Sequence, residues 1–395
     1  MGKSPIASLC ALVAVGTVMV PLLAGCGTTG PATGATMKQV AELKGSDTVG
    51  GDEFGTSVAV SGTRAVVGTA EGSYVGRAYV FTKTRSGWEQ IAELKASDAT
   101  TGDRFGSSVA ISGTTVLVGA YDQAKNAGRA YVFTKTASGF EQTAELKGSD
   151  TAVDDYFGWS VAVAGTTAVV GAVGHSRYMG RAYVFTKTAS GWEQSAELEG
   201  AGTVSDDGFG TSVAVSGATV VVGAEGYAKG AGRAYVFTKT AAGWTQVAVL
   251  KGSDTVTGDN FGTSVAVAGT TAVVGAYGPS NFAGRAYVFI DAATGWKQVA
   301  ALKGADTVAG NYFGVSVAIS GATVLVGAYD HANTAGAAYV FTHTVSGWKQ
   351  AAELTGSDTA AGDYFGNSVA VSGATSVAGS YGRAKFAGRA YVFGS

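Results

Sequence analysis

Apolar residues along most of the chain fall into short runs separated by turns rich in Gly, Ser, Thr and Asp. One representative stretch contains four such runs, at Phe105 to Ser112, Val116 to Ala120, Gly128 to Lys135 and Gly139 to Lys147. Each run is rich in β-branched or aromatic side chains, which predicts a β-strand. The links Ser112 to Thr115 and Thr136 to Gly139 are so short that consecutive strands must run antiparallel. The stretch is therefore predicted to be a four-stranded meander.

This pattern occurs seven times, and a Phe-Gly dipeptide marks each repeat at spacings of 51 and then 52 residues. The dipeptides begin at Phe54, Phe105, Phe157, Phe209, Phe261, Phe313 and Phe365. Neither face of the third run, Gly128 to Lys135, is strongly polar, so both faces of each sheet need cover. Radial stacking about an axis provides that cover. The prediction is an all-β, seven-bladed β-propeller of four-stranded antiparallel blades.

The two ends of the repeated region complement each other. The last repeat stops at Ser395 after three strands, whereas residues 38–44 match the fourth strand of the first repeat, residues 89–95. We expect residues 38–44 to complete the seventh blade, so that the N-terminal strand closes the ring and removes an open sheet edge. The predicted propeller spans residues 38–395.

Composition narrows the class of protein. The chain has 395 residues, of which 46% are hydrophobic and only 14% charged, so disorder is excluded. Lys plus Arg (27) nearly balance Asp plus Glu (29), which argues against a nucleic-acid partner. The 61 Gly against only 4 Pro fit many tight turns between short strands.

The N-terminus has the pattern of an export signal. Lys3 precedes an apolar run from Ile6 to Leu23, and the run ends in Leu-Ala-Gly-Cys at Cys26. This ending resembles the bacterial lipobox, which implies lipid attachment at Cys26. We predict a lipoprotein signal peptide over residues 1–25, a flexible tether over residues 26–37, and an exported protein anchored to the bacterial cell envelope, periplasmic or surface-exposed. Simple secretion and a retained membrane anchor are the alternatives.

The repeated motif resembles a known family. Phe-Gly-x-Ser-Val-Ala, then Val-Val-Gly-Ala and Gly-Arg-Ala-Tyr-Val-Phe, resemble the FG-GAP repeat in its bacterial form, which is related to the propeller of integrin α chains. The resemblance covers residues 38–395 and implies a propeller. Integrin propellers carry calcium in an acidic loop between strands one and two, but here that link, for example Ser112 to Thr115, contains no carboxylate. We therefore do not expect integrin-type calcium sites in this chain.

Asp recurs at two positions in the links that lead from one blade to the next. The first position holds Asp47, Asp98, Asp150, Asp254, Asp306 and Asp358, and the second holds Asp52, Asp103, Asp155, Asp207, Asp259 and Asp363. We expect these residues to hold turns and to pair with the Arg that begins strand three; weak calcium binding by each loop is the alternative. The predicted structural ion pairs are Asp52–Arg77, Asp103–Arg129, Asp155–Arg181, Asp207–Arg233, Asp259–Arg285 and Asp363–Arg389.

The sixth repeat is the reason for predicting these ion pairs. It alone lacks the strand-three Arg, with Ala337 in its place, and it alone has Asn311 at the second Asp position. Joint loss of both charges is expected of an ion pair, because one half-buried charge left without its partner is costly.

The links between strands two and three vary most among the repeats, and they lie at the same end of the propeller as the blade-to-blade links. We call this end the top face. Aromatic and cationic residues on varied loops are typical of a recognition surface. The candidate ligand-binding residues are Tyr74, Tyr121, Lys125, Trp159, Arg177, Tyr178, Tyr277, Phe282, Tyr329, Tyr381, Arg383 and Phe386. Neutral drift, with the tyrosines packing on neighbouring blades, is the alternative. Trp159 is predicted either to line the central channel or to fill space.

Motifs for catalysis are lacking. The three histidines, His175, His331 and His343, have no metal-ligand spacing, and no nucleophile-elbow, Walker or zinc-protease motif occurs. We therefore predict a non-enzymatic, monomeric binding, adhesion or scaffolding module with a protein or glycan partner on the top face, no catalytic or metal site and no cofactor. A glycan-acting enzyme that uses top-face Asp residues and a purely structural envelope component are the alternatives.

Overall fold

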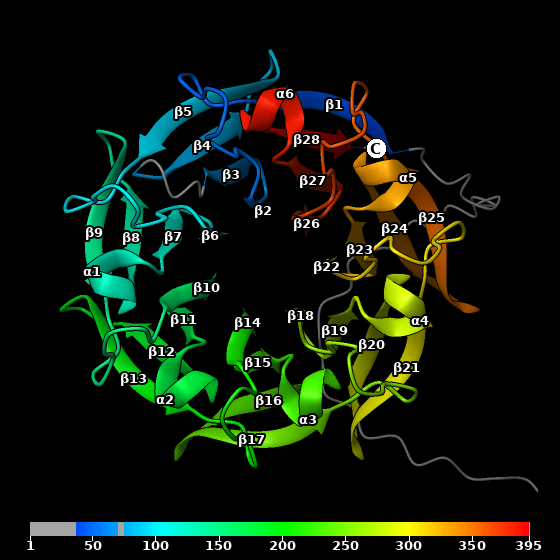
Figure 1. Ribbon diagram of the computed structural model, residues 1–395. Coiled ribbons are helices and arrows are strands. Elements are labelled where there is room, and N and C mark those ends of the chain that lie inside the picture. The colour runs from blue at the N-terminus through cyan, green and yellow to red at the C-terminus, as the bar shows by residue number, and fades with distance from the viewer. Residues whose placement is uncertain (1–36, 70–74, 395) are drawn as a thin grey trace, which may run out of the picture. The chain divides into compact units, whose positions relative to one another are not determined.

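The computed structural model describes residues 37–69 and 75–394; the predicted signal peptide, Cys26, most of the predicted tether and Tyr74 lie outside these ranges. The described residues form seven four-stranded antiparallel sheets around a central axis (Figure 1). Blades 1 to 7 are numbered from the first Phe-Gly dipeptide. The all-β, seven-bladed fold predicted from the sequence is confirmed.

Each of the first six blades contains four strands that are consecutive in the chain. In blade order, the innermost strands are β2 (Ser57–Ser61), β6 (Ser108–Ser112), β10 (Phe157–Ala164), β14 (Phe209–Ser216), β18 (Ser264–Ala268), β22 (Ser316–Ser320) and β26 (Val369–Ser372). The second strands are β3 (Arg64–Thr69), β7 (Thr115–Ala120), β11 (Thr167–Ala172), β15 (Thr219–Ala224), β19 (Thr271–Ala276), β23 (Thr323–Ala328) and β27 (Thr375–Ser380).

The third strands carry the Tyr-Val-Phe motif, and the fourth strands form the outer rim. The third strands are β4 (Arg77–Lys83), β8 (Arg129–Lys135), β12 (Arg181–Lys187), β16 (Arg233–Thr240), β20 (Arg285–Ala292), β24 (Ala337–Thr344) and β28 (Arg389–Gly394). The outer strands are β5 (Trp88–Leu94), β9 (Phe140–Leu146), β13 (Trp192–Leu198), β17 (Gly243–Leu250), β21 (Gly295–Leu302), β25 (Gly347–Leu354) and, in blade 7, β1 (Lys38–Leu43).

Closure of the ring follows the prediction. β1 pairs with β28 in antiparallel register, with Lys38 opposite Gly394 and Leu43 opposite Ala390. The N-terminal strand is thus the outer strand of blade 7, and each of the seven blades in the described ranges has four strands.

The core lies between neighbouring blades. Tyr131 is fully buried and Phe133 is nearly so, and both pack against Phe105 with ring centroids 5.7 and 5.9 Å apart. The same cluster includes Val66 and Val80 of blade 1, so each hydrophobic layer is shared by two sheets. β7 is buried along its whole length, as expected for β-branched residues covered on both faces.

Phe105 lies before the first strand of its blade, whereas the sequence pattern places it inside that strand. β6 begins at Ser108, and Phe105 forms an isolated bridge with Gly76 of the preceding blade. The equivalent bridges Gly180–Phe209 and Gly336–Phe365 show why Gly precedes strand three. Both glycines have φ of +83°, and an added Cβ would lie 1.9 Å from the Phe209 carbonyl oxygen or 2.0 Å from that of Phe365.

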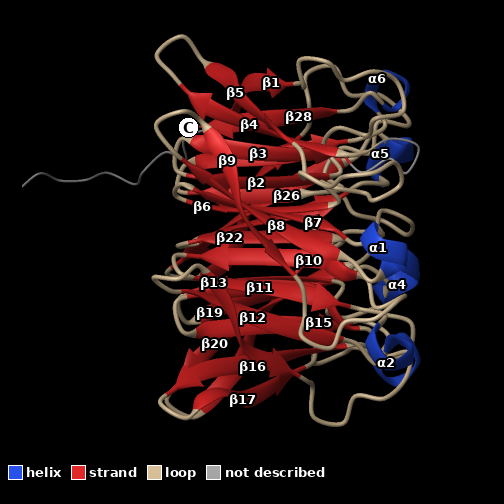
Figure 2. Cartoon of the chain, turned by 90° about the vertical axis from the view of Figure 1, so that its left-hand side faces the viewer, coloured by secondary structure: helices blue, strands red, loops and turns tan. Residues whose placement is uncertain are grey.

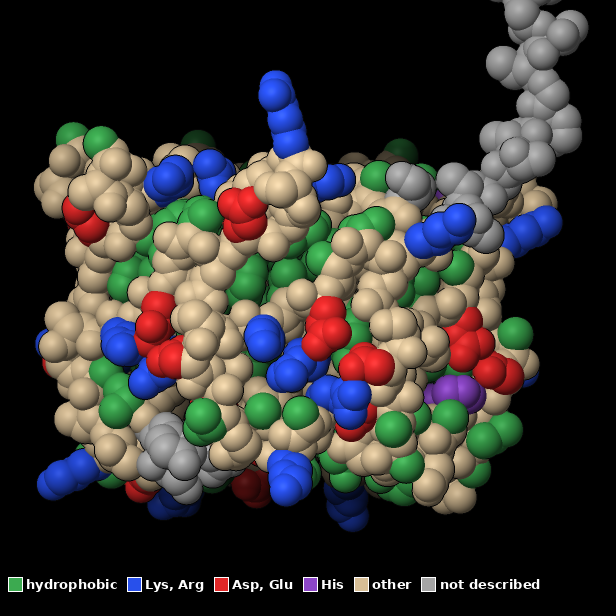
Figure 3. All heavy atoms as spheres, turned by 90° about the horizontal axis from the view of Figure 1, so that it is seen from above, with side chains coloured by type: hydrophobic (Ala, Val, Ile, Leu, Met, Phe, Trp, Pro, Cys, Tyr) green, Lys and Arg blue, Asp and Glu red, His purple; other side chains and the backbone are tan. Residues whose placement is uncertain are grey.

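The side of the propeller carries charges of both signs, interspersed with apolar atoms (Figure 3). This distribution fits the near-neutral formal charge of −2. Among the residues that the structure describes, no helix has the length and apolarity needed to cross a membrane.

Candidate functional site

Among the residues that the structure describes, the links between strands two and three contain six short segments, and the five of them labelled in Figure 2 lie at one end of the propeller. The six segments are α1 (Gln123–Asn126), α2 (His175–Tyr178), α3 (Tyr227–Gly230), α4 (Pro279–Phe282), α5 (His331–Thr334) and α6 (Arg383–Phe386). The blade-to-blade links reach the same end, as predicted. The backbone N–H of Tyr156 donates to the Asn126 carbonyl at 2.7 Å, and that of Tyr312 donates to the Phe282 carbonyl at 2.8 Å.

These segments have an unusual backbone. In α2, Ser176, Arg177 and Tyr178 have φ of 52°, 62° and 59°, which is the left-handed region. Each such residue costs about 1–2 kcal/mol unless it is glycine. A hydrogen bond of 2.9 Å from the Gly180 N–H to the His175 carbonyl closes the turn, and the Tyr178 carbonyl accepts a further bond from Gly208 of the next blade. The most varied segments of the sequence therefore share one strained turn that the adjacent blade holds in place.

Aromatic rings form a continuous row over blades 5 to 7. We call this row the aromatic arc; its members are Tyr277, Phe282, Tyr312, Tyr329, Tyr364, Tyr381 and Phe386. Phe282 and Tyr312 are 5.1 Å apart, and Tyr364 and Tyr381 are 5.0 Å apart with nearly parallel planes. Offset-stacked pairs at these distances stabilise one another and hold their rings rigidly. Since Tyr329 belongs to blade 6 and contacts Tyr364 of the link into blade 7, the arc crosses between blades.

A second group of rings lies over blades 2 and 3. The Tyr121 and Trp159 rings are 4.8 Å apart, and Tyr156 packs against Trp159 and Tyr178. We call these four residues the Trp159 cluster. The guanidinium of Arg104 lies 5.6 Å from the centre of the Tyr121 ring and pairs with Asp122 at 2.7 Å.

The Trp159 cluster adjoins the central channel. Tyr121 and Trp159 line a cavity of about 570 Å³ together with Ser and Thr side chains of the innermost strands, such as Ser108 and Thr211. Trp159 is 40% exposed there. Of the two predictions for Trp159, the structure agrees with a channel-lining position.

The predicted ligand-binding residues therefore fall into two groups and a remainder. Tyr121, Trp159 and Tyr178 come together in one cluster, and five others lie in the aromatic arc. Lys125 and Arg177 are exposed on α1 and α2. Arg383 instead pairs with Asp358 at 2.7 Å, so its charge is already compensated within the chain.

The sequence analysis missed three members of these groups. Tyr156, Tyr312 and Tyr364 each directly precede a Phe-Gly dipeptide and have φ of 55°, 56° and 55°. At the same position other repeats have Glu53, Arg104, Gly208 and Asn260. Variation at this position of the blade-to-blade links is the sequence signal for these tyrosines, whereas most of the candidates above came from the links between strands two and three.

Burial affects the hydroxyl groups of the arc. It raises the pKa of Tyr277 and of Tyr381 to about 12, and it also raises the pKa of Tyr329. These phenols are therefore protonated at neutral pH and offer O–H donors rather than charges.

The predicted ion pairs of the second Asp position are wrong about the partner. In the described ranges, none of these pairs approaches within 4.0 Å: Asp52–Arg77, Asp103–Arg129, Asp155–Arg181, Asp207–Arg233, Asp259–Arg285 and Asp363–Arg389. Each second Asp instead accepts the backbone N–H three residues earlier, as Asp103 does from Thr100 at 2.6 Å and Asp207 does from Val204 at 2.7 Å. The turn satisfies these carboxylates, five of which are buried, as predicted for residues that hold a turn.

The arginines pair with other acidic residues. Arg181 contacts Asp150 at 2.8 Å and Glu197 of the outer strand at 3.0 Å, and Arg77 contacts Asp47 and Glu93 in the same manner. Arg285 pairs with Asp254, whereas Arg129 and Arg389 pair with Glu145 and Glu42. In blade 4, Gly202 replaces the first Asp, and Arg233 lies over the Tyr227 ring at 3.9 Å.

The first Asp also accepts a hydrogen bond from the tyrosine of strand three. Tyr183 donates to Asp150 at 2.7 Å, and Tyr339 donates to Asp306 at 2.9 Å. Burial would raise the pKa of Asp150, but Tyr183 and Arg181 outweigh it, and the pKa is lower than usual. Both carboxylates of these links thus act as hydrogen-bond acceptors inside the fold.

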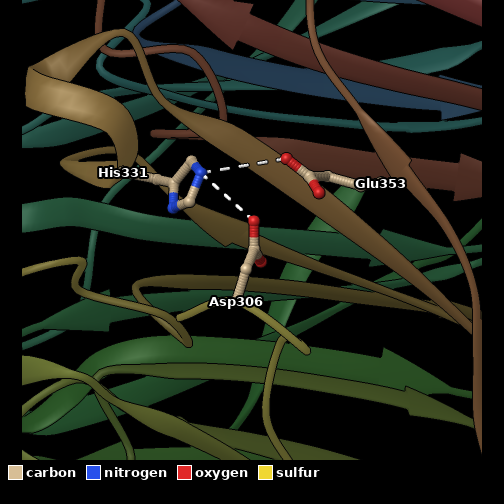
Figure 4. Close-up of side chains that lie close together, drawn as sticks. All are labelled: Asp306, His331 and Glu353. Atoms are coloured by element: carbon tan, nitrogen blue, oxygen red, sulfur yellow. Dashed lines mark ion pairs between the residues drawn. The ribbon is translucent and has the colours of Figure 1, made fainter. Parts of the chain in front are cut away.

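Blade 6 departs from this arrangement. Asn311 still accepts the Val308 N–H at 2.8 Å, so the turn is kept. Ala337 leaves Asp306 without an arginine, and the imidazole Nε2 of His331 lies 3.5 Å from Asp306 and 3.8 Å from Glu353 (Figure 4). The joint change of Ala337 and Asn311 is therefore not the loss of one ion pair. Asn311 holds a turn, whereas the arginine that Ala337 replaces pairs in blade 3 with the first Asp and the outer-strand Glu.

Comparison with known proteins agrees with the geometry of the blades. The FG-GAP repeat pattern matches residues 37–81, 88–133, 140–185, 192–237, 244–289, 296–341 and 348–393. A chain in the crystal structure of the mitotic checkpoint complex is similar in fold, with a TM-score of 0.59, 13% identity, and coverage of 96% of this chain and 98% of that one. A search of curated proteins found no match. Since seven matches account for most of its length, the chain belongs to the FG-GAP repeat family.

Proposed function

We propose that this protein is a non-enzymatic binding module whose top face docks a protein partner through the aromatic arc. In this proposal the propeller is exported as a monomer and anchored to the bacterial cell envelope through a lipid on Cys26, as the N-terminal sequence predicts. The fold itself is compatible with binding or scaffolding. The aromatic arc is the single observation that carries the proposal.

Strained backbone beneath the rings supports a recognition role. Six ring-bearing residues of the two groups have left-handed φ angles: Tyr156, Tyr178, Phe282, Tyr312, Tyr364 and Phe386. A bulky residue in this region is uncommon and costs free energy, and such strain concentrates at functional sites. Rings that are already stacked and held by adjacent blades lose little freedom on binding, which favours affinity.

A protein partner fits the arc better than a glycan. Because neighbouring rings in the arc stack on one another, much of each ring face is covered, as for Tyr364 and Tyr381. A sugar ring stacks on an open aromatic face. Tyr, Trp and Arg dominate the energetics of protein interfaces, and Phe282 and Phe386 remain 39% and 42% exposed at the edge of the arc.

A glycan is the second candidate, and the channel favours it. Trp159 is 40% exposed beside the cavity of about 570 Å³, which is lined by serine and threonine hydroxyls. This combination of one open indole and several hydroxyls suits a single sugar end group.

The distribution of perturbed carboxylates favours binding over catalysis. Burial raises the pKa of Asp122, Asp259, Asp330 and Glu353, and these four residues are distributed over blades 2, 5 and 6 or the links into them. An acid–base pair needs two such groups that converge on one substrate. A glycan-acting enzyme and a purely structural envelope component remain the competing functions.

The test combines pull-down from envelope extracts and a glycan array with matched variants of the soluble propeller, residues 37–395, with and without a chelator. The Tyr364→Ala/Tyr381→Ala variant is expected to lose protein partners, and Trp159→Ala is expected to lose glycan signals only. Val345→Ser, at a fully exposed position in the link at the opposite end, is the control. Partners that the arc variant retains would contradict the proposal.

A further inference from the structure

We propose that Asp306, His331 and Glu353 form a zinc-binding site on the top face of blade 6. The three side chains come from the link into the blade, from α5 and from the outer strand β25. Their nearest ligand atoms all lie within 4.8 Å of one another, and Figure 4 shows the imidazole directed at both carboxylates.

The distances suit a small divalent ion. Zinc binds His nitrogen and carboxylate oxygen at about 2.0–2.2 Å, so two ligands of a tetrahedral zinc are about 3.4 Å apart. His331 Nε2 lies 3.5 Å from Asp306 Oδ2 and 3.8 Å from Glu353 Oε1. Small side-chain adjustments therefore produce three ligand bonds and leave a fourth position for water.

Hydrogen bonds orient the imidazole for this role. Asn311 Oδ1 accepts the Val308 N–H, which fixes the amide so that its oxygen faces His331 Nδ1 at 3.2 Å. An amide oxygen only accepts, so Nδ1 carries the proton. In the neutral imidazole the lone pair then lies on Nε2, the atom that faces the carboxylates. Metal-binding histidines are commonly held by a hydrogen bond of this kind on their other nitrogen.

The second oxygen of Asp306 is also engaged. Asp306 Oδ1 accepts the hydroxyl of Tyr339 at 2.9 Å, which leaves Oδ2 turned toward His331. Each ligand thus presents one free atom to the same point, and the support comes from residues of the blade itself.

Comparison among the blades indicates that a cation is missing here. Five blades have both a first Asp and the matching Glu of the outer strand, and four of these also have the strand-three Arg. Blade 6 is the exception, with Ala337. A divalent ion supplies the charge that Arg181 supplies in blade 3.

The ligand set favours zinc over calcium. Calcium and magnesium prefer sites made entirely of oxygen, whereas an imidazole nitrogen suits zinc and its neighbours among the transition metals. The site is also accessible, because the Asp306 and Glu353 side chains are 48% and 35% exposed.

Isothermal titration of zinc chloride into the untagged, chelator-treated protein tests the proposal. One zinc per chain is expected. His331→Gln removes a ligand, and Ala337→Arg places in the site the arginine that the other six blades have at this position; each is expected to weaken zinc binding at least about 100-fold. His175→Gln, the equivalent change in blade 3, is expected to leave the affinity unchanged, and calcium chloride is expected to give no competing heat.

Circular dichroism and the thermal midpoint show whether each variant folds, and Ala337→Arg is expected to fold because the blades accommodate this arginine elsewhere. Absence of zinc binding to the unmodified protein would overturn the proposal, as would equal affinity in the His331→Gln or Ala337→Arg variants. Loss of binding in His175→Gln would place the site in blade 3 and would also overturn it.

Discussion

Blades 3 and 6 carry similar polar residues on the top face and differ at two positions: Arg181 corresponds to Ala337, and Asp155, which contacts His175, corresponds to Asn311, which contacts His331. Asp150, His175, Tyr183 and Glu197 of blade 3 correspond to Asp306, His331, Tyr339 and Glu353 of blade 6, three repeats further along the chain. In blade 3 Arg181 lies between the two carboxylates. In blade 6 Ala337 takes its place, and the histidine faces both carboxylates instead.

The difference shows how a repeated scaffold acquires a local chemical function. The turn, the tyrosine hydroxyl and the two carboxylates are kept in both blades, because each serves the fold. Removal of one arginine then converts a compensated ion pair into a set of three open ligands. Other blades have a different long polar side chain at the position of the histidine. Gln123 in blade 2 and Arg383 in blade 7 contact the first Asp of their own blades.

The largest losses of stability are expected from the glycine that precedes strand three, and they should be equal in blades 3 and 6 because both blades use this glycine in the same way. Gly180→Ala and Gly336→Ala each place a Cβ within 2.0 Å of a backbone carbonyl at a positive φ. Each change is expected to lower the free energy of unfolding by about 3 kcal/mol or more, measured by urea unfolding. Gly295→Ala, where a Cβ meets no atom within 4 Å at a φ of +92°, is the control and should cost less. A large difference between Gly180→Ala and Gly336→Ala would show that the blades are not mechanically equivalent.

Removal of the strand-three tyrosine hydroxyl should lower the stability of blades 3 and 6 but not that of blade 4. Tyr183→Phe and Tyr339→Phe each remove a hydrogen bond to a carboxylate, with an expected loss of about 2 kcal/mol. Tyr235→Phe is expected to have little effect or to stabilise, because the Tyr235 hydroxyl is buried and has no partner among the described residues. Equal losses in all three variants, measured by the same urea unfolding, would show that the Asp contact adds nothing.

Arg181→Ala should make blade 3 resemble blade 6. The variant removes the guanidinium that contacts Asp150 and Glu197, with an expected loss of about 1 kcal/mol because these carboxylates are partly exposed. It also opens the set Asp150, His175 and Glu197, so a second zinc per chain is expected in titration calorimetry. A double variant with His175→Gln is the control and should return to one zinc. Unchanged stoichiometry in Arg181→Ala would mean that the arginine does not decide between the two states.

Most of the fold could be predicted because the signal is repeated seven times. The β-branched and aromatic content of the runs, the short links and the Phe-Gly spacing all indicate the same meander, and the match of residues 38–44 to the outer strands indicates how the ring closes. The residue at which strand one begins does not follow from these patterns. Phe105 looks like part of a strand in the sequence, but its backbone bridges to the preceding blade, a contact that no local pattern shows.

The candidate sites were predicted only in part, for a different reason. Varied aromatic positions could be recognised one by one, but their stacking into an arc depends on contacts between adjacent blades. The arginine partners were wrong because two changes in the same repeat, Ala337 and Asn311, suggested a contact that geometry does not provide. The histidine cluster joins three distant segments, so its members have no characteristic spacing in the sequence.

The smallest expected effect concerns the acid dependence of blade 3. The pKa of Asp150 is lowered in the folded protein, so this carboxylate stabilises the fold above the unfolded pKa of about 3.9 and loses that contribution as the pH falls through the folded value. The stability difference between the His175→Gln protein and its Asp150→Asn derivative should therefore be largest near pH 7 and shrink toward pH 3, measured by urea unfolding; the His175→Gln background removes the histidine titration. Because Asp150 is 41% exposed, the change should be smaller than that of Arg181→Ala. A constant difference across this range would mean that Arg181 does not hold Asp150 in its charged form, and the contrast between blades 3 and 6 would then rest on shape rather than on charge.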